Sequence, residues 1–168
     1  MSSHIQKHNK KVLKEPVDEP NSNTCNCRGR NKDNCPLDGN CLATCIVYKA
    51  TVNSDLGEMV YFGLSEGTFK SRLANHNKSF NRVRYMNDTN LSKYIWSLKE
   101  SDVNYNIKWT IAAKCFPYVC GSRKCDLCLS EKLLISKADP NICLNTRAEL
   151  ISKCRHSNKF KLKNLKDI

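Results

Sequence analysis

Residues 46–76 read IVYKATVNSDLGEMVYFGLSEGTFKSRLANH, and this stretch decides the fold. Two short apolar runs, 47–52 and 59–63, are rich in β-branched and aromatic residues and are separated by the polar segment 53–57. Such runs joined by a short segment of Asn, Asp and Gly predict a β-hairpin. Each predicted strand carries one tyrosine, Tyr48 in the first and Tyr61 in the second.

A helix is predicted to follow the hairpin over residues 68–77, beginning at Thr68. Arg72 and His76 are four residues apart in this segment, so a helix places them on one face. The stretch therefore predicts two phenols, a guanidinium and an imidazole that could converge on one site.

The rest of the chain predicts one more strand and further helices. Thr89-Asn90 is a helix cap before residues 91–101, whose apolar residues recur at helical spacing. Residues 105–111 alternate and predict a third strand. Pairing of this strand beside the hairpin gives an α+β fold, a three-stranded antiparallel sheet flanked by helices.

The chain has 168 residues with 28 Lys and Arg against 16 Asp and Glu, a formal net charge of +12. This length suits one domain with a modest core, and the charge favours a polyanionic partner such as DNA. The alternative is a solvated basic surface. No apolar run is long enough for a transmembrane helix, so no membrane partner is expected. The N-terminal residues lack an apolar signal core, so we expect an intracellular protein.

Eleven cysteines without an export signal indicate metal binding rather than disulfides. The first cluster lies in residues 25–45 among turn-forming residues, with too few apolar side chains for a core of its own. Four thiolates around a tetrahedral zinc ion would stabilise this N-terminal zinc knuckle. Unliganded thiols in a loop are the alternative. The predicted ligands are Cys25, Cys27, Cys35 and Cys41.

A second cluster combines a C-x-x-C pair at the start of an apolar helix with a Cys-x-His pair after the short helix 147–153. A redox C-x-x-C is the alternative, but the βαβ context of a thioredoxin is missing. The predicted zinc ligands are Cys125, Cys128, Cys154 and His156.

Residues 78–88 mix basic and aromatic side chains, a composition that suits a surface following a nucleic-acid backbone. An ordinary connecting loop whose aromatic side chains close the core is the alternative. The predicted nucleic-acid contacts are Lys70, Lys78, Arg82 and Arg84. The ends of the chain, 1–24 and 161–168, are polar or basic and predict a disordered arm and a basic tail.

The ordered set of motifs from Cys25 to about Phe160 resembles the GIY-YIG nuclease family. Tyr61-Phe62-Gly63 stands for the second half of the motif, and Ile46-Val47-Tyr48 keeps the tyrosine of the first half but not its glycine. The Arg72 and His76 spacing also matches, and Glu131 and Asn145 follow in the family's order. The cysteine pattern is similar to the branch attached to Penelope-like retroelements.

This resemblance implies a nuclease domain over 46–160 in which Glu131 binds Mg²⁺ or Mn²⁺ and Arg72 binds the scissile phosphate. Tyr48 would be the general base and Tyr61 would orient the nucleophile or the phosphate. His76 would assist proton transfer or bind phosphate, and Asn145 would support the site.

The implied function is a metal-dependent DNA endonuclease, a target-nicking module with a reverse transcriptase as fusion or partner, acting in the nucleus. Two alternatives stay open. One is a catalytically inactive nucleic-acid-binding module, which the incomplete first motif half allows. The other is a zinc-stabilised protein-interaction module in which the basic charge is incidental.

Overall fold

The computed structural model describes residues 24–27, 35–119, 122, 124–154 and 156. The predicted arm, apart from Thr24, and the predicted basic tail lie outside these residues.

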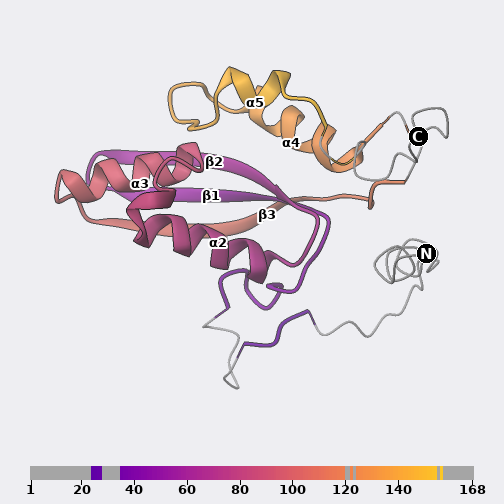
Figure 1. Ribbon diagram of the computed structural model, residues 1–168, viewed down its shortest axis with the longest axis horizontal. Helices are drawn as coiled ribbons and strands as arrows, with labels where there is room; N and C mark the ends of the chain where they lie inside the picture. Colours follow the sequence, from indigo (N-terminus) through magenta and orange to yellow (C-terminus); the bar gives the residue numbers. More distant parts are fainter. Residues whose placement is uncertain (1–23, 28–34, 120–121, 123, 155, 157–168) are drawn as a thin grey trace, which may run out of the picture.

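The centre of the fold is a three-stranded antiparallel sheet, as the sequence predicts, and its strands lie in the order β2-β1-β3 (Figure 1). Strands β1 (Ile46–Ser54) and β2 (Gly57–Ser65) form the hairpin, and β3 (Tyr105–Lys114) pairs with the other edge of β1. Both hairpin strands are longer than predicted because only two residues form the turn. Gly57, at φ +116°, begins β2 in a conformation that favours glycine.

Two helices, α2 (Phe69–Asn81) and α3 (Asn90–Glu100), pack on one face of the sheet. Thr68 and Thr89 are their N-caps, which confirms both predicted helix starts. Helix α2 continues one turn beyond residue 77, and the 3₁₀ helix η2 (Val83–Tyr85) follows. The alternative of a connecting loop is therefore wrong for residues 78–81, which are helical. Its other part is correct for Phe80, whose side chain is buried in the core.

The other face of the sheet is covered by α4 (Asp126–Lys137) and α5 (Arg147–Ile151). Because helices cover both faces, β1 is buried on both sides, with Tyr48 facing α2 and Val47 facing α4. None of the helices in the described ranges has the length and apolar character needed to cross a lipid bilayer.

The outer edge of β2 is closed by residues 142–145. Val60 N–H donates to the Ile142 carbonyl (2.7 Å), and Leu144 N–H donates to the Val60 carbonyl (2.8 Å). The side chain of Asn145 continues this ladder by accepting from Phe62 N–H (2.7 Å) and donating to the Phe62 carbonyl (2.9 Å). The C-terminal half of the chain therefore completes an edge of the sheet that the hairpin begins.

Candidate functional site

Two of the predicted site residues, Arg72 and His76, meet at the hydroxyl of Tyr48, a residue that is 0% exposed. Arg72 donates from Nε to this oxygen at 2.9 Å, and His76 Nε2 lies 2.7 Å from it. Because Arg72 is the donor, the Tyr48 hydroxyl can in turn donate its proton to a neutral His76. Helix α2 therefore brings the two residues that share its face onto one phenol of the sheet.

Gly63 leaves the space that the Tyr48 hydroxyl fills. The two residues are opposite each other in the β1–β2 register. A Cβ atom added at Gly63 would lie 2.4 Å from the Tyr48 hydroxyl oxygen, closer than non-bonded atoms approach. The glycine of the Tyr-Phe-Gly segment is therefore required by the position of the tyrosine in the neighbouring strand.

Replacing Gly63 with alanine is expected to destabilise the protein by about 1–3 kcal/mol, the usual cost of overpacking a core. Tyr48 cannot yield easily, because Phe69 and Trp109 also contact its ring. Urea unfolding measures the change. Gly67→Ala is the matched control, since a Cβ there meets nothing within 4 Å. Equal unfolding midpoints for the two variants would contradict the steric explanation.

Burial sets the protonation state of the Tyr48–His76 pair. Desolvation raises the pKa of Tyr48, although the Arg72 guanidinium opposes that rise. Desolvation and the charge of Arg72 lower the pKa of His76 to about 3. The ring of His76 stacks on Phe80 and lies against Trp109, with ring centroids 5.8 and 5.3 Å apart. At neutral pH the pair is therefore a neutral phenol and a neutral imidazole.

Glu131 of α4 lies close enough to Tyr48, Tyr61 and Arg72 for its charge to affect the pKa of each. Desolvation and the Glu149 carboxylate raise the pKa of Glu131 to about 7, while Arg72 opposes the shift. A nearby cation would favour the ionised form of such a buried carboxyl group, because its positive charge offsets the cost of ionisation.

The N–H groups along the outer edge of β2 connect Glu131 to Asn145. Phe62 N–H donates to Asn145 Oδ1. Leu64 N–H, the next backbone N–H group on this edge of the strand, donates to the Glu131 carboxylate. Tyr61 lies in the same strand, with its ring centroid 6.3 Å from that of His76, and desolvation raises the pKa of its buried phenol. Asn145 thus fixes the backbone of β2 and does not point its amide at the Tyr48 hydroxyl.

The first cysteine group could hold a metal ion such as zinc. The ligand atoms of its four cysteines lie within 4.8 Å of one another. The Cys41 sulfur is 3.5 Å from that of Cys25 and 3.6 Å from that of Cys27. A tetrahedral zinc ion with bonds of about 2.3 Å places sulfurs about 3.8 Å apart, so the spacing fits. Burial raises the pKa of Cys35, but backbone N–H groups including those of Leu37 and Gly39 lower it to about 6.

This knuckle also supports helix α2. The first N–H groups of a helix have no partner inside it. Here Phe69 N–H donates to the Ala43 carbonyl (3.0 Å) and Lys70 N–H donates to the Cys41 carbonyl (2.8 Å). The segment that could bind the first metal therefore fixes the start of the helix that carries Arg72 and His76.

The second group could hold a similar ion at the start of α4. The Cys128 sulfur lies 3.2 Å from His156 Nδ1 and 3.5 Å from the Cys154 sulfur, and the Cys125 sulfur lies 3.5 Å from His156 Nδ1. All four ligand atoms lie within 4.8 Å of one another. Glu131 follows Cys128 by three residues, so an ion bound by this group would fix the start of the helix that carries the carboxylate.

Glu66 is a residue of this region that sequence patterns did not indicate. Its carboxylate lies 3.8 Å from His156 Nε2, the ring nitrogen that faces away from the three sulfurs. A carboxylate in this position orients a ligating histidine. Glu66 lies between β2 and α2, and no local motif relates it to a histidine ninety residues later. The sequence also does not indicate that Glu149 lies near Glu131. Its position three residues after Thr146 predicts only the capping box of α5.

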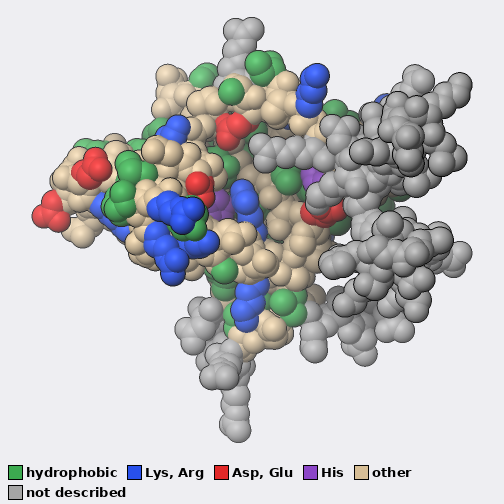
Figure 2. All heavy atoms as spheres, in the orientation of Figure 1, with side chains coloured by type: hydrophobic (Ala, Val, Ile, Leu, Met, Phe, Trp, Pro, Cys, Tyr) green, Lys and Arg blue, Asp and Glu red, His purple; other side chains and the backbone are tan. Residues whose placement is uncertain are grey.

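The predicted nucleic-acid contacts are exposed, and most lie around the end of α2. Figure 2 shows Lys and Arg side chains gathered over this part of the surface. Lys78 and Arg84 lie over the ring of Tyr85, with Nζ and Cζ 4.2 and 5.7 Å from its centroid, and Arg82 is beside them in sequence. Lys70 is separate, because its Nζ donates to Asn26 of the knuckle (2.7 Å).

Comparison with protein families, with curated proteins and with solved structures finds no significant match to this chain.

Proposed function

We propose that this protein is a metal-dependent endonuclease that hydrolyses phosphodiester bonds in DNA. The observation that carries the proposal is the joint hydrogen bonding of Tyr48 to Arg72 and His76, with Glu131 in electrostatic reach of the same group. The net charge of +12 supports a nucleic-acid substrate. The resemblance of the motif order to the GIY-YIG family supports a target-nicking module of retroelement origin, working with a reverse transcriptase.

In this reaction a water oxygen bonds to phosphorus, the bond from phosphorus to the leaving sugar oxygen breaks, and that oxygen receives a proton. The site must stabilise the added negative charge on the phosphate. Arg72 suits this task. Its Nε donates to the Tyr48 hydroxyl, while its Nη groups hydrogen bond to no residue in the described part of the chain. The free side of the guanidinium can then bind two phosphate oxygens.

The Tyr48–His76 pair supplies a route for the proton of the attacking water. Tyr48 is protonated at neutral pH, so it accepts a proton only as it passes its own to His76 Nε2, 2.7 Å away. The Arg72 charge disfavours an imidazolium ion at His76. A phosphate bound to Arg72 offsets part of that charge, so the substrate itself makes the transfer easier.

Glu131 is the residue we assign to Mg²⁺ or Mn²⁺. Such an ion supplies charge stabilisation and makes a bound water more acidic. Among the described residues, only the two cysteine-rich groups bring three or more His, Cys, Asp or Glu ligand atoms together. Water and phosphate oxygens would therefore be the other ligands at Glu131, as is common for magnesium. We assign structural zinc to the two cysteine-rich groups.

Nucleic-acid binding without cleavage is the second candidate, and the complete burial of Tyr48 favours it. A base that acts on water must reach that water. This candidate predicts retention of DNA that weakens as salt increases, with no cleavage under any divalent ion.

Incubation of supercoiled plasmid with zinc-loaded protein tests the proposal. Added Mg²⁺ or Mn²⁺ is expected to produce nicked circles, and omission of both ions is expected to prevent nicking. Arg72→Lys keeps the positive charge but loses the planar fork, and we expect it to reduce cleavage about a hundredfold or more. DNA binding by gel shift should change much less. Nicking at an unchanged rate in the Arg72 variant would contradict the assigned role.

A further inference from the structure

A pocket of about 420 Å³ lies between the turn of the knuckle and the outer strand β3. Its volume is in the range of about 300–1,000 Å³ that is typical of small-molecule sites. It does not contain the Tyr48 hydroxyl, and none of the proposed catalytic residues lines it. The residues that line it are Pro36, Asp38, Asn106, Ile107, Lys108 and Trp109.

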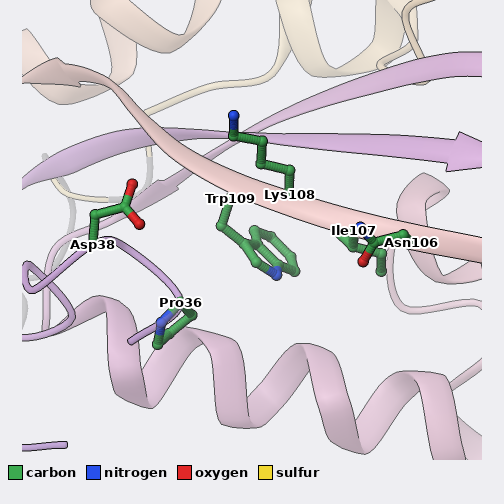
Figure 3. Close-up of a pocket in the computed structure, with 6 residues that line it drawn as sticks. All are labelled: Pro36, Asp38, Asn106, Ile107, Lys108 and Trp109. Atoms are coloured by element: carbon green, nitrogen blue, oxygen red, sulfur yellow. The ribbon is translucent and has the colours of Figure 1, made fainter. Parts of the chain in front are cut away.

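Trp109 brings a buried hydrogen-bond donor to this pocket. The residue is only 9% exposed, yet its indole N–H has no hydrogen-bond acceptor among the described residues. The N–H of Trp96, by contrast, donates to the Ser79 carbonyl at 2.8 Å. Figure 3 shows the indole projecting from β3 into the space beside the knuckle turn, with its nitrogen on the edge away from the strand. A buried donor without an acceptor is costly, so the pocket gains from a ligand that offers one.

Asp38 brings hydrogen-bond acceptors to the pocket, because its carboxylate can only accept. Its carboxylate points toward β3 across the pocket, and the residue is held at φ +46° in the turn of the knuckle. The rings of Pro36 and Trp109 and the side chain of Ile107 add apolar walls. The pocket therefore suits a flat ring that gives hydrogens to a carboxylate, accepts one from an indole and is otherwise apolar on its faces.

We propose that this pocket binds an unpaired guanine base of a single-stranded nucleic acid. Guanine carries two adjacent hydrogen donors on its Watson–Crick edge, which match the two oxygens of one carboxylate, and a ring carbonyl that can accept from an indole N–H. Adenine, cytosine and thymine have no two adjacent donors on this edge, because an acceptor lies directly beside the donor group of each. Proteins read unpaired bases through this edge. The inference rests on the proposed action on nucleic acid and adds a base preference to it.

Trp109 also connects the pocket to the proposed catalytic residues. The ring that lines the pocket lies 5.3 Å from the ring of His76 and 5.8 Å from that of Tyr48, measured between centroids. In the sheet, Trp109 pairs with Ala50, which pairs in turn with Tyr61. A base held against Trp109 is thus placed on the face of the sheet that carries the phenols, two strands from Tyr61.

Fluorescence of the single remaining tryptophan in a Trp96→Phe variant tests this inference, since the chain has two tryptophans. The zinc-loaded protein is titrated with nine-nucleotide thymidine strands that carry guanine, adenine, cytosine or thymine at the centre, without added Mg²⁺ or Mn²⁺. The guanine strand is expected to change Trp109 emission and to bind about tenfold more tightly than the others, the usual scale of a paired base contact. A strand with hypoxanthine, which lacks one of the two donors, should bind with an affinity between that of the guanine strand and those of the other strands.

Asp38→Asn is the matched protein variant, because asparagine tolerates positive φ while it removes the carboxylate. It is expected to abolish the guanine preference and to leave binding of the thymine strand unchanged. Equal affinity for all four strands, or a guanine preference that survives in the variant, would overturn the inference. Cleavage plays no part in this measurement. Failure to nick plasmid with a retained guanine preference would therefore reject the nuclease and keep the pocket.

Discussion

Replacement of Glu131 by glutamine is expected to reduce Mg²⁺-dependent DNA cleavage by about a thousandfold or more. A catalytic metal contributes several kcal/mol of charge stabilisation in the transition state, and the variant loses the carboxylate that we assign to hold it. Glutamine has nearly the same shape and can still accept a hydrogen bond from Leu64 N–H, so the edge of β2 should remain in place. Initial nicking rates at saturating protein measure the change.

The same substitution is expected to stabilise the fold at alkaline pH. The pKa of Glu131 rises from 4.5 to about 7 on folding, mainly through desolvation. The folded protein without a metal therefore binds more protons than the unfolded chain between these values, and its stability falls as pH increases through this window. Above pH 7 the full cost is present, about 2 kcal/mol after allowance for partial solvent access. Glutamine removes this cost.

Urea unfolding of wild type and Glu131→Gln at pH 5 and pH 8, both without added Mg²⁺ or Mn²⁺, measures this effect. We expect similar stability at pH 5 and a more stable variant at pH 8. Glu58→Gln is the control, since Glu58 lies on the exposed part of β2. A variant that cleaves DNA normally would reject Glu131 as the metal ligand. A variant that is destabilised at pH 8 would contradict the account of its burial.

Replacement of Cys128 by serine is expected to remove one of two bound zinc ions and to lower the melting temperature by on the order of 10 °C. Structural zinc contributes about 10–16 kcal/mol of apparent binding energy in small domains, and loss of part of it should weaken the packing of α4. Because Glu131 lies one turn further along α4, cleavage should decrease together with the zinc content. Native mass spectrometry counts the ions, and hydrogen exchange reports on the helix.

Cys143→Ser is the control for this experiment, because Cys143 belongs to neither metal-binding group and its sulfur lies 3.7 Å from Asn145 Oδ1. This variant should retain two zinc ions and normal exchange in α4. Two zinc ions in the Cys128 variant would reject the ligand assignment. Loss of one ion with unchanged cleavage would show that the metal does not position Glu131.

The hairpin, the two threonine caps and the four-residue spacing of Arg72 and His76 could be predicted because each depends on neighbouring residues in sequence. The pattern of cysteines likewise predicted both metal-binding groups, since ligand spacing within each half is local. The closure of the β2 edge by Asn145 could not be predicted from local pattern, because it joins residues 83 positions apart. The pocket at Trp109 was missed because one strand and one turn form it together.

Closure of the β2 edge has a consequence for the order of events during synthesis. Tyr48, Arg72 and His76 leave the ribosome well before Glu131, and residues 142–145 follow later still. A nascent chain can form the hairpin and α2 early, but it lacks both the carboxylate and the segment that secures Phe62. If the protein is the nuclease we propose, a chain that has not yet extended past residue 145 is therefore expected to lack nicking activity.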